Sequence, residues 1–138
     1  MAKRAVPFPR SYVNTPVRDA LAAFEAAPSV AGIQRVLELA TTGGLVVDVT
    51  GSTPESGPRV RTLTSTEGEL VLPLFTSLSE LGLAVPEAER ADVQGTILPG
   101  RDALSIVASA DIVAVQFDAG SRQIIVKRSF VDEARASK

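Results

Sequence analysis

The chain has 138 residues, of which 45% are hydrophobic and 22% are charged, and its 14 basic and 16 acidic residues leave a net charge of −2. A chain of this length forms one domain and buries roughly 70% of its unfolded surface. The nearly balanced charge argues against a nucleic-acid or membrane-surface partner, and no apolar stretch approaches the roughly 20 residues of a membrane span. We therefore expect one cytoplasmic domain.

The sequence contains no histidine and no cysteine. These residues are the usual ligands of zinc, haem iron and iron–sulfur clusters, and they supply the base or the nucleophile in Ser-His-Asp and Cys-His enzymes. Neither glycine-rich phosphate-loop pattern occurs. We therefore expect no cofactor, no metal and no enzymatic activity. A metal-dependent carboxylate enzyme remains an alternative, built from residues whose spacing follows no metal-loop rule, namely Asp48, Asp111, Asp118, Glu87 and Glu89.

The N-terminal part of the chain predicts a flexible tail over residues 1–14, and a single domain over residues 15–138. Thr15 and Pro16 are typical of a helix start, and the apolar residues that follow recur with helical spacing until Pro28. Ser29 predicts the start of a second helix. We expect these two helices to form a helical hairpin.

A β-branched run predicts a strand over residues 45–50, and residues 60–66 and 70–76 read as a β-hairpin. Pro73 interrupts the second strand of this hairpin. Because proline cannot donate a backbone hydrogen bond, we expect Pro73 at a sheet edge or a bulge. Phe75 is expected in the core, and Ser77 with Glu80 forms a capping box that predicts a helix from residue 78.

The remaining pattern predicts a strand over residues 93–98, a helix over 99–110, a second hairpin over 111–128 and a last helix from Ser129. Lys127 and Arg128, at the end of that hairpin, are interpreted as charges that protect a strand edge. The order of elements indicates an α+β fold. We expect a mixed, mainly antiparallel sheet of five to six strands, with the helical hairpin and short helices packed on it.

Two short motifs resemble a known family. "PLFTS", at residues 73–77, and "DAGS", at residues 118–121, occur in an order and spacing similar to the SseB N-terminal domain, from the enhanced serine sensitivity proteins. The resemblance covers roughly residues 15–135, and it implies a bacterial domain of unknown function. The family commonly has a proline in the second motif, where this chain has Ala119. A function residing in a second domain is not carried over.

The leading functional hypothesis is a non-enzymatic module that binds a protein partner or itself. Its candidate surface is the Pro73-bearing strand edge, or the region of Phe75, Thr76 and Ser77, where a helix start offers free N–H groups. The alternative is a small-ligand or anion-binding regulatory domain. It would use two helix N-termini, near residues 76–78 and near residues 100–102, where Gly100 and Arg101 precede a helix.

Overall fold

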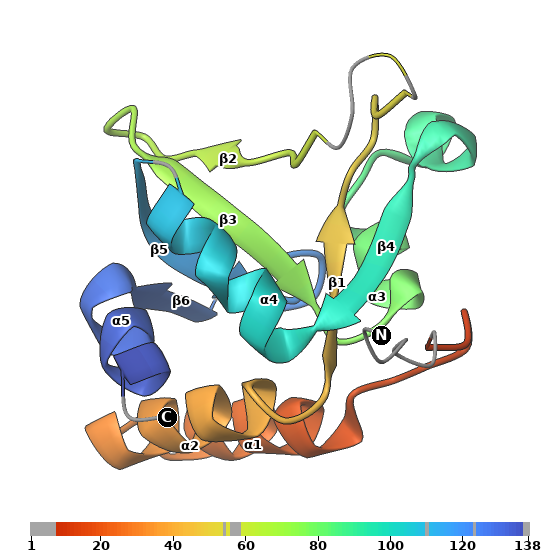
Figure 1. Cartoon of the computed structure of the whole chain (residues 1–138). Helices are drawn as coiled ribbons and strands as arrows, with labels where there is room; N and C mark the ends of the chain where they lie inside the picture. Colours follow the sequence, from red (N-terminus) through yellow and green to blue (C-terminus); the bar gives the residue numbers. More distant parts are fainter. Residues whose placement is uncertain (1–7, 54, 56–58, 110, 123, 137–138) are drawn as a thin grey trace, which may run out of the picture.

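The computed structural model describes residues 8–53, 55, 59–109, 111–122 and 124–136. Within these ranges the chain forms α-helices, two short 3₁₀ helices and a single mixed sheet (Figure 1). In chain order they are α1 (Thr15–Ala26), α2 (Val30–Ala40), β1 (Gly44–Asp48), β2 (Leu63–Thr64), β3 (Leu70–Phe75), α3 (Leu78–Leu83), η1 (Glu87–Asp92), β4 (Gly95–Pro99), α4 (Gly100–Ser105), η2 (Ile106–Ser109), β5 (Ile112–Phe117), β6 (Ile124–Lys127) and α5 (Arg128–Ala136).

Over the described residues the sheet has six strands, in the order β4-β1-β3-β5-β6, with β2 paired to β3. β5 pairs along one side of β3, so β1 and β2 share the other side, with β1 at the last residues of β3 and β2 at its first. β3 and β5 run parallel, whereas all other described pairs are antiparallel. The α+β class, the mainly antiparallel sheet and the N-terminal helical hairpin are confirmed.

The caps of the first two helices explain where each helix begins. Asn14 is the N-cap of α1, since its side-chain oxygen accepts a hydrogen bond of 3.1 Å from the Val17 N–H. The expectation of a cap at Thr15 is wrong by one residue, because the asparagine before it already fills that role. Ser29 is the N-cap of α2, as predicted, and accepts a bond of 3.0 Å from the Gly32 N–H.

Most of the core lies on one face of the sheet, where α1, α2, α4 and α5 pack. Figure 1 shows α1 and α2 side by side at the lower end of the sheet, with α5 beside β6. A smaller cluster on the opposite face joins Val46, Phe75 and Leu81, and it brings α3 onto β1 and β3. Within the described residues, none of the helices has the length and apolar character needed to cross a bilayer.

The expected tail over residues 1–14 falls partly outside the described residues, which begin at Phe8. The ring of Phe8 lies against that of Tyr12, with 4.7 Å between their centroids. The Tyr12 hydroxyl accepts a hydrogen bond of 2.9 Å from the Gly44 N–H. Residues 8–14 therefore contact the start of β1.

Candidate functional site

The sheet face that carries α3 is covered only in part. Paired residues of neighbouring strands share a face, so the register defines what surrounds α3 on this side. We call the part beyond α3 the open sheet face. It consists of Leu63, Val71, Pro73, Ala114, Gln116, Ile125 and Lys127.

The open sheet face is unusually apolar for a surface that meets water. A sheet with one solvated face normally carries polar side chains there. Here Ile125 is 55% exposed and Leu63 is 41% exposed, and they lie on the outermost strands of the face, β6 and β2. Val71 and Ala114 lie between them and are buried. A partner that covered the whole face would bury both exposed side chains together.

A cavity of about 320 Å³ opens on this face. Pro73, Phe75 and Gln116 lie at its base, on β3 and β5. One wall is the segment 61–63 before and at the start of β2, and the other is the segment 84–86 after α3. The structure thus brings two of the sequence-predicted site residues, Pro73 and Phe75, to one cavity.

Pro73 lies in an inner strand, so the expected sheet edge is wrong. β3 has β5 on one side and β1 with β2 on the other. On the second side Phe75 and Leu74 pair with β1, and Val71 with β2. Pro73 falls between these two ladders, in a position that pairs with neither β1 nor β2. The bulge in β3 lies between Leu70 and Val71, not at the proline.

Charged groups stand at the borders of the open sheet face. Arg61 is 48% exposed, and its Nε lies 4.0 Å from Oδ2 of the nearly buried Asp48. The other oxygen of Asp48 accepts hydrogen bonds from the N–H and hydroxyl of Thr50, at 3.0 and 2.6 Å. Glu89 lines the cavity from η1. Lys127 is exposed on β6, and no ion pair among the described residues involves it.

Behind the cavity, Thr76 and Asp118 join the two motifs that carry the family resemblance. Asp118 accepts a hydrogen bond of 2.8 Å from the Thr76 N–H and one of 2.9 Å from its hydroxyl. Both residues are fully buried. Burial raises the pKa of the Asp118 carboxyl above 3.8, its ordinary value, and the bonds from Thr76 oppose that shift. Thr76 is therefore already satisfied and is closed to a ligand.

The backbone of Asp118 also fixes the turn between β5 and β6. Its φ of 49° lies in the left-handed region, which Asp and Asn tolerate better than most residues. Its carbonyl accepts hydrogen bonds from the N–H groups of Ser121 and Arg122, at 3.0 and 2.8 Å. Asp118 thus ties this turn to the end of β3.

Ser77 is the N-cap of α3, as the capping box predicts. Its hydroxyl accepts a hydrogen bond of 3.2 Å from the Glu80 N–H. The Glu80 carboxylate instead turns toward other elements, accepting bonds of 3.2 Å from the Arg18 guanidinium and 2.7 Å from the Ser121 hydroxyl. These contacts link α1, α3 and the β5–β6 turn, so Ser77 and Glu80 hold the fold together.

The other predicted candidates, Gly100 and Arg101, lie away from this cavity, at the start of α4. The Gly100 N–H donates a hydrogen bond of 2.6 Å to the Gly43 carbonyl. A Cβ at position 100 would collide with the backbone carbonyl of Ala40, so only glycine fits there. Arg101 is exposed, next to Asp102 in the same first turn. α3 packs in the smaller core cluster and α4 in the larger one, so the two helix starts lie on opposite faces of the sheet.

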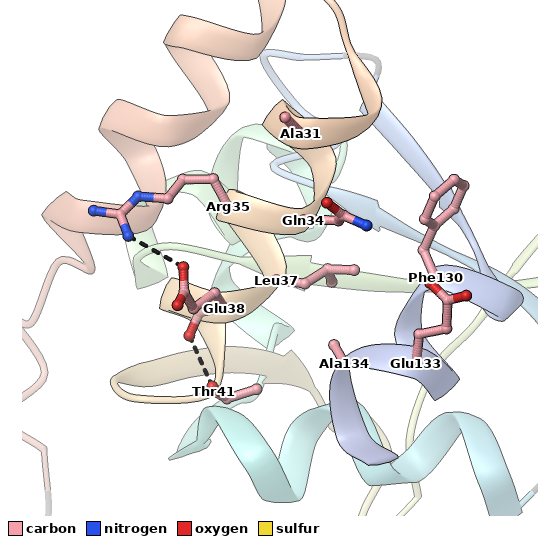
Figure 2. A pocket seen from close by; sticks show the side chains of 9 residues that line it. All are labelled: Ala31, Gln34, Arg35, Leu37, Glu38, Thr41, Phe130, Glu133 and Ala134. Carbon is pink, nitrogen blue, oxygen red and sulfur yellow. Dashed lines mark hydrogen bonds and ion pairs between the residues drawn. The ribbon is translucent and has the colours of Figure 1, made fainter. Parts of the chain in front are cut away.

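A second, larger hollow of about 550 Å³ lies between α2 and α5. Figure 2 shows Gln34 and Leu37 pointing from α2 toward Phe130 on α5, while Arg35 and Glu38 pair with each other at the rim, 3.1 Å apart. The sequence does not predict this hollow. Its lining mixes apolar and charged groups.

Among the suggested carboxylates, Asp48 and Glu89 both line the cavity on the open sheet face, but Asp118 is bound to Thr76 behind it. Within the described parts of the chain, no group of three or more acidic residues is arranged to hold a metal ion.

Sequence reasoning missed Leu63, Gln116 and Ile125. One signal was present for Ile125, which occupies the outward position of an alternating strand where a polar residue is expected, between the buried Ile124 and Val126. Leu63 and Gln116 need the strand register before they can be placed on this face.

The chain was also compared with known proteins. Neither the curated proteins nor the solved structures gave a match. The family model described as "SseB protein N-terminal domain" matches residues 17–132, which include the open sheet face, the Thr76–Asp118 contact and nearly all the helices. The chain therefore belongs to the SseB N-terminal domain family.

Proposed function

We propose that this domain is a non-enzymatic protein-interaction module that binds its partner through the open sheet face. The observation that carries the proposal is the exposure of two apolar side chains on this face: Leu63, which lines the cavity, and Ile125, which pairs with Gln116 at its base. Apolar side chains at such positions lose contact with water when a partner covers them, which favours binding by roughly 25 cal/mol for each Å² of apolar surface removed.

The chemistry of the residues favours binding over catalysis. The sequence supplies neither histidine nor cysteine. The hydroxyls of Thr76 and Ser77 are engaged in hydrogen bonds that join strands and cap a helix. The alternative, a small ligand or anion bound at the helix starts near residues 76–78 and 100–102, has less support. There the side-chain oxygen of Ser77 and the Gly100 N–H already have partners within the fold.

Site-specific photo-crosslinking in the source organism tests the proposal. The photoreactive amino acid p-benzoylphenylalanine replaces Ile125, and a matched chain carries it in place of Val30, which is 57% exposed on α2. We expect a discrete crosslinked protein from position 125 and not from position 30. The product should disappear when Leu63→Asp is added to the position-125 chain, because a charge there would be desolvated by the partner.

Equal products from both positions, or none from position 125, would refute this role for the open sheet face. A crosslink between two copies of the chain would identify the partner as a second copy, and sedimentation of the purified protein would then give its affinity.

A further inference from the structure

We infer that the segment bound on the open sheet face is an amphipathic α-helix of another protein, with acidic residues flanking its apolar stripe. The inference rests on the proposed function and specifies the chemistry of the partner. It follows from the way the same face is covered elsewhere, from the size of the uncovered part and from the charges at its borders.

The covered part of the face already uses a helix. α3 lies on β1 and β3 and contributes Leu81 and Leu78 to the cluster around Phe75. α3 ends at Leu83, and the chain turns away into η1. The cavity begins at this point, with residues 84–86 as its wall. A second helix beside α3 would extend the layer that α3 begins.

The open sheet face is about as wide, across its strands, as a short helix is long. It spans four neighbouring strands, β2, β3, β5 and β6. At about 4.8 Å between strands, the distance from β2 to β6 is roughly 14 Å, and a helix of about ten residues has that length. The cavity of about 320 Å³ has room for one large apolar side chain from such a helix. A single anchored side chain of this kind often dominates an interface.

The charge of Lys127 at the β6 border, which has no ion-pair partner among the described residues, favours acidic residues on the bound helix. Lys127 lies at the β6 border of the face. It pairs with Ala114 on β5, which pairs with Val71 on β3 and so leads across the sheet to Leu63 on β2. Arg61 lies on the opposite side, before β2, and its side chain is 48% exposed, with Nε 4.0 Å from Oδ2 of Asp48. Lys127 can therefore donate hydrogen bonds to a carboxylate of a partner, whereas Arg61 would share a partner carboxylate with Asp48. Glu89 is on the η1 side of the cavity, so the acidic residues of the helix are expected away from η1.

A peptide selection tests the inference with the full chain as bait. Two displayed libraries of roughly 16-residue peptides are compared, one patterned to form helices and one with a central proline that prevents them. We expect enrichment from the helix library alone, with glutamate and aspartate exceeding lysine and arginine at the polar positions. The enriched peptide should gain helical circular dichroism when it binds.

Variants of the chain then locate the binding site. Fluorescence anisotropy of one enriched peptide is measured against Ile125→Asp and Lys127→Glu, with the exposed Val30→Asp and Arg101→Glu as matched controls. We expect the first two variants to weaken binding about tenfold or more and the two controls to change it less than about twofold. Circular dichroism of each variant confirms that it is folded.

The possible failures are distinguishable from failure of the proposed function. Enrichment of proline-containing or basic peptides that still depend on Ile125 would overturn the acidic helix and leave the binding face in place. No enrichment, or enriched peptides unaffected by Ile125→Asp, would overturn the inference, while crosslinking at position 125 still decides the function. A dimer of the chain that Ile125→Asp abolishes would overturn it as well, since a second copy would then occupy the face.

Discussion

The contact between Asp118 and Thr76 allows a paired test of how the two family motifs are held together. In Asp118→Ala both hydrogen bonds to Thr76 are lost, and its N–H is left unpaired in a fully buried place. An unpaired buried N–H costs about 1–3 kcal/mol, and the hydroxyl bond contributes about 1 kcal/mol. Alanine at a φ of 49° adds about 1–2 kcal/mol. We expect a loss of about 4 kcal/mol in the free energy of unfolding.

Asp118→Asn should behave differently, because asparagine keeps both contacts. Its amide oxygen can accept from the Thr76 N–H, its amide nitrogen can donate to the Thr76 hydroxyl, and asparagine tolerates the left-handed conformation. It also removes a carboxyl that is costly to ionise in its buried place. Near pH 7 we therefore expect this variant to be at least as stable as the wild-type protein.

The pH dependence follows from the direction of the Asp118 pKa shift. At pH values above 3.8 the Asp118 carboxyl loses its proton in the unfolded chain. In the folded chain it keeps the proton to a higher pH, because burial raises its pKa. The unfolded state then binds fewer protons than the folded state, so this group makes stability fall as pH rises, until the folded carboxyl ionises too. Asp118→Asn lacks this loss. Its stability relative to wild type should therefore rise from about pH 3 upward and then level off.

Urea unfolding at several pH values measures both effects. The chain has no tryptophan, so unfolding is followed by far-ultraviolet circular dichroism, and equal m-values would show that the variants unfold from comparable states. The reasoning is refuted if Asp118→Asn loses as much stability as Asp118→Ala near pH 7. A stability difference between Asp118→Asn and wild type that is the same at every pH would show that the carboxyl has no raised pKa.

Three further predictions concern stability and use the same urea assay. Phe75→Ala should cost about 3–5 kcal/mol, because the ring is only 2% exposed; a loss below about 1 kcal/mol would contradict its place in the core. Gly100→Ala should cost about 3 kcal/mol, since its Cβ would meet the carbonyl of Ala40, and an unchanged midpoint would contradict that close approach. Ile125→Asp should change stability by less than about 0.5 kcal/mol, as should its control Val30→Asp, because both side chains are mostly exposed; a large loss only at position 125 would assign Ile125 to the fold.

The element order was predictable from local signals, whereas the pairing of the inner strands was not. Helical spacing and the Ser29 and Ser77 caps marked the helices, and turn residues marked the hairpins. The continuous apolar run of β3 is typical of an inner strand, but no local signal identifies its neighbour β5, which lies far along the chain. The predicted edge position of Pro73 is wrong because the rule that proline avoids inner strands assumes continuous pairing on both sides. On one side of β3 the pairing with β2 ends before Pro73 and the pairing with β1 begins after it.

The candidate site was predictable only in part, for a similar reason. Pro73 and Phe75 were singled out from the sequence, and both line the cavity. Leu63 and Ile125 were not, because they join the same surface only once three strand registers are known. The partner of Thr76 was missed as well. It is 42 residues away, and no short-range rule connects a strand exit with an acidic turn at that distance.

The parallel pairing of β3 with β5 has a consequence for biosynthesis. As the chain leaves the ribosome, α1 and α2 can associate through contacts close in sequence. β3 can complete its parallel pairing only after β5, which ends at Phe117, has been synthesised. Pairings between distant segments are slow to form, and a waiting strand exposes unpaired backbone groups. A ribosome stalled before that point would hold a nascent chain in which one side of β3 has no partner strand and is open to aggregation.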